Sequence, residues 1–179
     1  MIWLSNSTLA RLRDQLQARG RRPSVVPQPG KSEEAVELDQ VVAEYGPLCD
    51  AMYLMMSADG TVSTEERDLL RGALRNLSTD SIRSAHMEAM LERAEKRIGS
   101  DGRDATMKSV VNALNNDPAR AEVAFVLAAA MAFADSAIAD EENETLNTFA
   151  DSLGIDEARA NELLDAVEAD LRNQAAEGG

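Results

Sequence analysis

Two short acidic segments hold the residues of this chain that are best suited to chemistry. In the first, Asp59 and Glu66 flank a glycine and a valine at the spacing of the second half of an EF-hand calcium loop. The same register requires oxygen ligands at Met55 and Ser57. Because a thioether is a poor ligand for a hard cation, the spacing excludes a standard EF-hand.

The second acidic segment repeats this pattern with Asp135 and Glu142, and Met131 and Phe133 stand at its two upstream ligand positions. Each segment therefore offers two carboxylates, fewer than a strong calcium site needs. Two interpretations follow. In the first, the two carboxylates of each segment hold a divalent cation such as Ca²⁺, with a Kd no tighter than roughly 10⁻⁴–10⁻³ M.

In the second interpretation the acids only stabilise the local fold. Ser63 and Glu66 have the spacing of a capping box. Glu65 lies in the first turn of the same helix, where a negative charge complements the helix dipole. In the second segment Glu141 occupies the position of Glu65, and Asp140 directly precedes it. We therefore expect Glu65, Asp140 and Glu141 to form an acidic loop surface.

Catalysis would require more than these carboxylates. One aspartate or one glutamate from each segment would suffice for a carboxylate pair of the hydrolytic type, but no nucleophile motif or phosphate loop accompanies them. His86 is the sole histidine, and its polar sequence neighbours predict a surface or half-buried position. Cys49 is the sole cysteine and is predicted to be a buried thiol. We predict that the chain is not an enzyme. We rank a hydrolase with paired carboxylates third, after a binding module and a cation sensor.

The charge of the chain restricts its partners. It has 32 acidic and 18 basic residues and a formal net charge of −14, which disfavours nucleic acid as a ligand. The first 31 residues nevertheless carry six basic residues and one acidic residue. The longest apolar run, residues 123–134, is too short to span a bilayer, and no signal peptide is evident. We expect a cytoplasmic protein, and peripheral attachment to the inner membrane is the alternative.

The elements that must position the acidic segments are helices throughout. Apolar residues recur at helical spacing in residues 5–19, 32–45, 47–58, 64–77, 80–98, 103–115, 118–134, 142–153 and 156–172. Gly46-Pro47 predicts a break between the second and third of these. The stretch 118–134 is apolar on nearly all sides and is predicted to be the central helix. No segment predicts a strand.

An internal duplication relates the two acidic segments. Residues 58–70 align with residues 134–146 when residue n is set beside residue n+76. The positions that are identical in the two copies are Ala58, Asp59, Glu65, Glu66 and Leu70. In each copy an apolar helix leads into a loop that begins with aspartate, and a helix that begins with acids follows. We therefore expect two helical halves related by an approximate twofold.

The motifs in these two halves resemble the TerB-like family, named for the tellurite-resistance protein TerB. The resemblance rests on A-D-G-x-V-S-x-E-E at residues 58–66, F-A-D at 133–135 and E-x-x-x-L-x-x-x-A-x-x-L-G at 142–154. It covers about residues 43–169, and it departs from the family at Ser136, where the family usually has glycine. The resemblance implies a compact bundle of about seven helices without known catalytic activity. It also implies a role in assemblies that respond to tellurite, other chemical stress or phage, and acidic loops able to meet a divalent cation.

The N-terminal region lies outside this resemblance. We predict three parts: a basic amphipathic arm with a proline-rich linker over 1–31, a helical domain over 32–173 and a frayed tail over 174–179. The arm has three interpretations, namely an anchor on an anionic membrane surface, a docking element for an acidic face of its own or another subunit, and a disordered start. Docking is favoured because the rest of the chain has a charge of −19. The predicted docking residues are Trp3, Leu9, Leu12, Leu16, Arg11 and Arg13.

Together these patterns predict a binding or scaffold module of a bacterial stress response that works through protein–protein contacts. Its predicted partners are proteins, including membrane-associated stress proteins, or a second copy of the chain bound through the arm. A sensor of divalent cations that uses the two acidic loops is the alternative.

Overall fold

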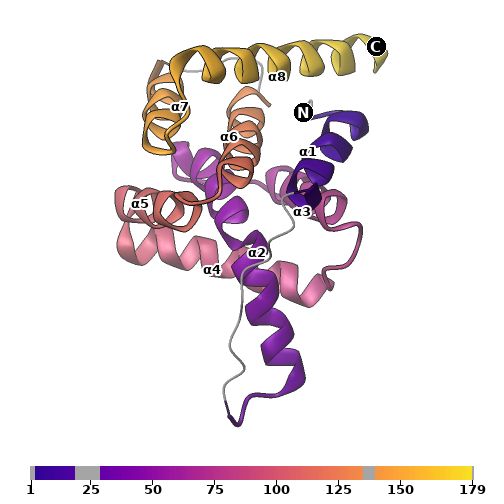
Figure 1. The fold of residues 1–179 in the computed structure, drawn as a ribbon, viewed down its shortest axis with the longest axis vertical. Helices are drawn as coiled ribbons and strands as arrows, with labels where there is room; N and C mark the ends of the chain where they lie inside the picture. Colours follow the sequence, from indigo (N-terminus) through magenta and orange to yellow (C-terminus); the bar gives the residue numbers. More distant parts are fainter. Residues whose placement is uncertain (1–2, 19–28, 135–139, 179) are drawn as a thin grey trace.

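The computed structural model describes residues 3–18, 29–134 and 140–178, and within these ranges the side chains of Asp59 and Glu141 are not described. The described residues form α-helices joined by short loops and contain no strand. This confirms the predicted all-α bundle (Figure 1). The helices are α1 (Asn6–Ala18), α2 (Glu33–Met56), α3 (Thr64–Ser78), α4 (Ser84–Asp101), α5 (Arg103–Leu114), α6 (Pro118–Phe133), α7 (Asp140–Ser152) and α8 (Glu157–Glu177), with a single 3-10 turn, η1 (Ser57–Asp59), after α2.

Local sequence signals set most of the helix ends. Side chains of Ser32, Ser63, Asp117 and Asp156 each accept a hydrogen bond from a backbone N–H in the first turn of the following helix, as predicted for N-caps. Gly154 follows α7 with a φ of 73°, the left-handed conformation that glycine adopts without a steric cost. The last helix, α8, ends at Glu177 and not near residue 173, because Gln174–Glu177 contains good helix formers and no breaker.

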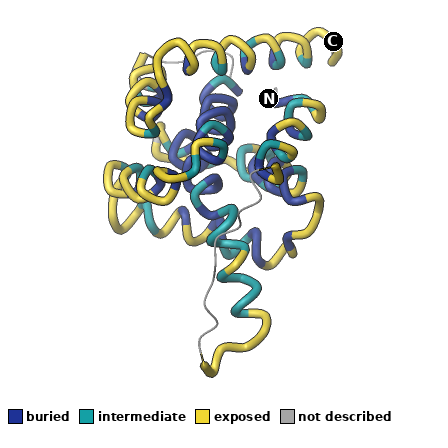
Figure 2. The backbone as a smooth tube through the Cα atoms, viewed as in Figure 1, coloured by how far each residue is buried: buried dark blue, intermediate teal, exposed yellow. Residues whose placement is uncertain are grey.

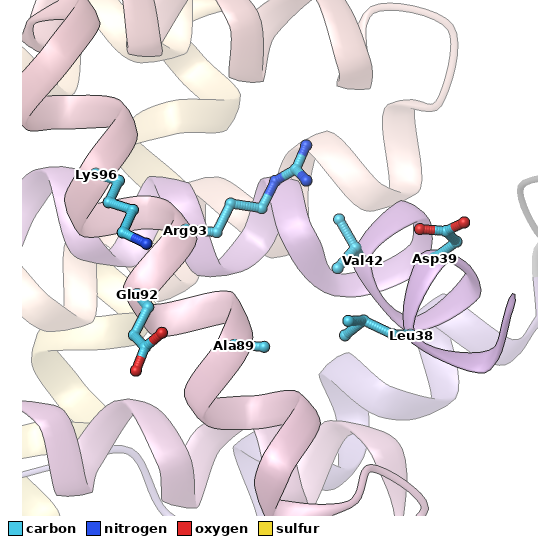
Figure 3. Close-up of a pocket in the computed structure, with 7 residues that line it drawn as sticks. All are labelled: Leu38, Asp39, Val42, Ala89, Glu92, Arg93 and Lys96. Atoms are coloured by element: carbon cyan, nitrogen blue, oxygen red, sulfur yellow. The ribbon is translucent and has the colours of Figure 1, made fainter. Parts of the chain in front are cut away.

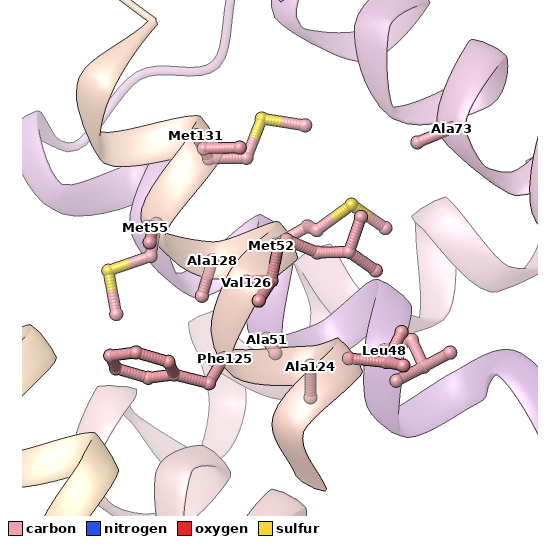
Figure 4. Packing of buried hydrophobic residues seen from close by; sticks show 14 of the residues in the cluster. Leu48, Ala51, Met52, Met55, Ala73, Ala124, Phe125, Val126, Ala128 and Met131 are labelled. Carbon is pink, nitrogen blue, oxygen red and sulfur yellow. The ribbon is translucent and has the colours of Figure 1, made fainter. Parts of the chain in front are cut away.

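The core surrounds α6, which Figure 2 shows buried through most of its length. α2 makes its most extensive contact with this helix, and the alanines Ala124 and Ala128 of α6 face Ala51, Met52 and Met55 of α2 (Figure 4). Small side chains in this contact allow the two helix backbones to approach closely. The predicted central position of residues 118–134 is therefore confirmed, and the methionines of α2 are core residues.

The contacts between helices repeat in the two halves of the chain. In the first half α2 packs on α3 and α4, and in the second half α6 packs on α7 and α8. The contacts between the two halves repeat as well. α1 packs on α3 of its own half and on α6 of the other half, and α5 packs on α7 of its own half and on α2 of the other half. In this pattern α1 occupies in the first half the place that α5 occupies in the second. The N-terminal helix is thus the first helix of a repeat of four.

One helix boundary predicted from the sequence was wrong. The dipeptide Gly46-Pro47 does not separate two helices, because α2 continues through Pro47 from Glu33 to Met56. Proline cannot donate a backbone N–H to the carbonyl four residues earlier, which here belongs to Ala43. The guanidinium of Arg120, on α6, donates instead to the carbonyl oxygens of Ala43 and Glu44. A long-range contact therefore satisfies the backbone at the position where the local signal predicted a break.

Ion pairs tie the outer helices to this core. Arg71 of α3 donates from Nε and Nη2 to the two carboxylate oxygens of Glu88 on α4, over 2.6 and 3.1 Å. Nε and Nη2 of Arg159 on α8 likewise donate to the two carboxylate oxygens of Glu122 on α6, over 2.8 and 2.9 Å. Such bidentate pairs fix orientation as well as distance.

Candidate functional site

The first acidic loop is organised by its cap. Glu66 N–H donates to the hydroxyl of Ser63 over 3.2 Å, and the N–H of Ser63 donates to Oε2 of Glu66 over 2.7 Å. This reciprocal pair confirms the predicted capping box. Gly60 stands before it with a φ of 89°, and Glu65 is exposed in the first turn of α3. One carboxylate oxygen of Glu66 is therefore committed to the helix start.

A permanent cation lies at the base of this loop. Nη1 of Arg103, at the start of α5, donates to the hydroxyl of Ser57 over 2.9 Å. Ser57 occupies one of the oxygen-ligand positions of the EF-hand register. Burial lowers the pKa of Arg103 relative to its ordinary value, and Asp104 partly offsets that effect. The guanidinium thus donates to the one hydroxyl at the two upstream ligand positions, Met55 and Ser57. Its positive charge disfavours the binding of a second cation there.

The second acidic loop lies mostly outside the described residues. Asp135 belongs to the undescribed stretch 135–139, and the side chain of Glu141 is not described. Asp140 is exposed at the start of α7, and Glu142 is half-buried in its first turn. Within the described part of the chain, no group of three or more His, Cys, Asp or Glu side chains is placed to hold a metal ion. The divalent-cation site remains a prediction, because the side chains of Asp59 and Asp135 are not described.

The structure places the predicted docking leucines in the interior of the chain. Leu9, Leu12 and Leu16 are 2%, 2% and 6% exposed and belong to the same apolar cluster as the rest of the core. They pack where α1 contacts α3 and α6. The docking surface of the predicted arm is therefore the body of its own chain. The burial of these apolar side chains stabilises the contact, and the charges of the arm alone do not predict it.

The remaining residues of the predicted arm lie at the edge of this contact. Trp3 is half-buried and packs against the core. Arg11 is exposed on the outward face of α1, and Nε of Arg13 lies 3.6 Å from Asp14 of the same helix. Only this outward face of α1 is available to another molecule.

Two reactive side chains considered in the sequence are both buried. Cys49 has no exposed surface, as predicted, and burial together with Asp50 raises the pKa of its thiol well above the ordinary value. His86 is 3% exposed, so its predicted surface or half-buried position was wrong. The ring nitrogens of His86 have no hydrogen-bond partner among the described residues. Its polar sequence neighbours face solvent from the other side of α4, and for this reason a local window could not predict its burial.

The structure also contains a groove that the sequence did not predict. It lies between the first half of α2, α4 and α5, and Figure 3 shows part of its lining. Apolar side chains of Leu38, Val42 and Ala89 lie beside the charged side chains of Asp39, Glu92, Arg93 and Lys96. Its continuation is lined by Gly46, Pro47, Asp50 and Arg97, and by Ser109, Val110 and Ala113 of α5.

Asp50 provides the buried charge of this groove. It is 5% exposed on a helix segment that is otherwise apolar, and its carboxylate accepts a hydrogen bond from Nη1 of Arg97 over 2.8 Å. Burial raises the pKa of Asp50 above its ordinary value, and the positive charges of Arg97 and Arg93 partly offset that rise. An acid within the apolar run 48–56 was the sequence signal that could have indicated this site.

The described residues define an all-helical domain of two related halves, and in each half a helix begins close to acidic residues. A family model described as tellurite resistance protein TerB matches residues 48–165. Since the match covers more than half of the chain, the chain belongs to the TerB family. This confirms the predicted resemblance, and α1 and the first half of α2 lie outside the matched range.

Comparison with curated proteins found no match, and neither did comparison with solved structures. None of the helices in the described ranges has the length and apolar character needed to cross a bilayer.

Proposed function

We propose that this chain is a non-catalytic binding or scaffold module of a bacterial stress-response system, that it works in the cytoplasm, and that it acts through protein–protein contacts. The stress is tellurite, another chemical agent or phage. Membership of the TerB family supports the link to tellurite resistance.

The groove between α2, α4 and α5 is the observation that carries the proposal. It combines an apolar lining, contributed by Leu38, Val42 and Ala89, with charged side chains of both signs. Such a mixture is typical of the surfaces that proteins offer to other proteins. The first half of α2 forms one wall and extends past the other helices in Figure 1. That wall precedes the family match, which begins at residue 48.

The environment of the reactive groups supports a role without catalysis. Neither the sole thiol, of Cys49, nor the sole imidazole, of His86, lines the groove. Both are buried in the core. Since catalysis by a thiol or an imidazole needs that group within reach of a substrate, neither residue can act in this groove, and binding is the function that we favour for this surface.

The proposal is tested in the organism of origin. A strain that lacks the chain should become more sensitive to tellurite, and the wild-type chain should restore resistance. A photo-crosslinking amino acid at Leu38, in the groove, should capture a partner protein, and the same amino acid at exposed Gln17 of α1 serves as the control. A second probe at exposed Glu144 of α7 reports on the acidic face. Unchanged tellurite resistance, with no adduct at Leu38 or Glu144 above the Gln17 level, would contradict the proposed function.

A further inference from the structure

One arginine of the groove has no hydrogen-bonded carboxylate among the described residues. Arg93 of α4 is exposed and has no hydrogen bond or ion pair with any described residue. In Figure 3 its side chain reaches from α4 toward Val42 of α2. By contrast Arg71, Arg97 and Arg159 each hold a carboxylate within 3.0 Å.

The acids near Arg93 are already committed or lie on its own helix. Asp39 accepts from Lys31, and Asp50 accepts from Arg97. Glu92 precedes Lys96 by one helical turn, and these two charges on neighbouring turns largely offset each other. Arg93 also interacts electrostatically with Asp50, but no carboxylate of the described residues accepts a hydrogen bond from it.

An apolar surface accompanies this charge. Leu38 and Val42 lie one turn apart on the face of α2 that meets α4, and both are only half-buried there. Ala89 lines the groove from α4, one turn before Arg93. Because Ala89 is small, it leaves room beside Leu38 and Val42 for an apolar side chain of a ligand. The surface therefore matches a ligand that places an anionic group beside an apolar one.

We propose that this groove binds an acidic amphipathic segment of a partner protein, with a carboxylate of the segment on Arg93 and its aliphatic or aromatic side chains against Leu38, Val42 and Ala89. This inference rests on the proposed binding function and names the chemistry of the partner. The charge of the whole chain favours a protein segment over a polyanion. A nucleic acid would meet repulsion over its full length, whereas a single carboxylate interacts chiefly with charges within about one Debye length, roughly 8–10 Å.

The contribution of Arg93 sets the size of the expected effect. An arginine–carboxylate hydrogen bond at a partly exposed interface contributes enough that its loss weakens binding by about 10- to 100-fold. Substitution by glutamate adds repulsion between like charges. Arg75 provides a matched control, since it is exposed on α3 and has no ion pair with a described residue. It does not line the groove.

The test uses a display library of random 12-residue peptides selected on the full-length protein. We expect the enriched peptides to combine Asp or Glu with Leu, Ile or Phe. A synthetic copy should bind wild type and Arg75→Glu equally, and Arg93→Glu about 10- to 100-fold more weakly. Leu38→Ala should also weaken it. Thermal unfolding of each variant shows whether it is folded, and Arg93→Gln replaces Arg93→Glu if the latter is not.

Three results with peptides would overturn the inference: no enrichment from the library, enrichment of basic or uncharged peptides, or equal binding to wild type and Arg93→Gln. Stronger binding of a single-stranded oligonucleotide or an anionic vesicle, lost in Arg93→Gln, would assign the groove to a different class of partner and would also overturn it. If the library fails but a probe at Glu144 captures a partner in cells, the proposed function stands on another surface. If the peptides bind but tellurite resistance is unaffected, the groove stands and the stress-response role fails.

Discussion

The guanidinium of Arg120 on α6 donates from Nε to the backbone carbonyl of Glu44 on α2, over 3.1 Å. Its Nη2 donates to the same carbonyl and to that of Ala43. Arg120 is 5% exposed, and the two residues are 76 positions apart in the chain. These carbonyls lie in the turn before Pro47, which lacks the N–H that Ala43 would otherwise receive. A buried cation of the second half therefore supports a helix of the first half.

Removal of this guanidinium should destabilise the protein strongly. Arg120→Met keeps the aliphatic part of the side chain but leaves the half-buried carbonyl of Ala43 without a donor, and we expect a loss of about 1–3 kcal/mol in the free energy of unfolding. Urea unfolding followed by circular dichroism measures it. Pro47→Ala restores a backbone N–H, so Arg120→Met should cost less in the Pro47→Ala background. Equal costs in both backgrounds would mean that Arg120 does not compensate for the proline.

The N-terminal helix should behave as part of the core. Leu12 is 2% exposed where α1 meets the bundle, and Leu12→Ala should lower the free energy of unfolding by about 2–5 kcal/mol. Gln17→Ala, at an exposed position of the same helix, should change it by less than about 0.5 kcal/mol. A single cooperative unfolding transition is expected for both variants. A separate early transition, or a Leu12→Ala effect no larger than that of Gln17→Ala, would show that α1 is only appended.

The pair between Glu122 and Arg159 should contribute stability that depends on pH. Its hydrogen bonds to Arg159 hold the pKa of Glu122 below its ordinary value of 4.5. A lowered carboxyl pKa stabilises the folded state above the ordinary value, and this stabilisation disappears as pH falls through the lowered one. Glu122→Gln should therefore cost about 1 kcal/mol near neutral pH and progressively less below pH 4.5. Urea unfolding across this range tests the sign, and a cost that grows on acidification would refute it.

Asp50 should show the opposite dependence. Its burial raises its pKa above the ordinary value of 3.8, so the folded state binds the proton more tightly than the unfolded chain does. Stability from this group is fully present below pH 3.8 and is lost as pH rises through the raised value. Relative to wild type, Asp50→Asn should therefore gain stability as pH rises from acid toward neutral. A constant difference between the two proteins would mean that Arg97 and Arg93 compensate fully for burial.

The capping box and the cation site predict different responses to calcium. Ser63→Ala removes the acceptor for the N–H of Glu66 and should cost about 0.5–2 kcal/mol of stability with or without Ca²⁺. Calorimetric titration of Ca²⁺ into wild type and into Asp59→Asn/Glu66→Gln separates the two roles. Flat traces for both proteins would leave the cap as the only role. Saturable heat in wild type that is absent from the double variant would establish a weak cation site.

Local signals in the sequence determined the helices and the family. Helical periodicity located nearly all of them, and caps such as Ser63 and Asp156 marked their starts, because a cap involves residues only three positions apart. The repeat of Asp59 and Glu66 at an offset of 76 residues, together with the motifs around it, indicated the TerB family. These features depend on residues that are close in the chain or recur in it at one fixed offset.

Only the tertiary structure decided the features that depend on distant partners. The sequence around Pro47 predicts the end of a helix. In the fold Pro47 lies inside α2, because Arg120 donates to the carbonyls of Ala43 and Glu44. Leu9, Leu12 and Leu16 could have faced a membrane, a partner or the chain itself until α3 and α6 were placed against them. The groove beside Arg93 likewise exists only where α2, α4 and α5 meet. Periodicity shows that a helix has an apolar face, whereas the packing of the whole chain selects what covers that face.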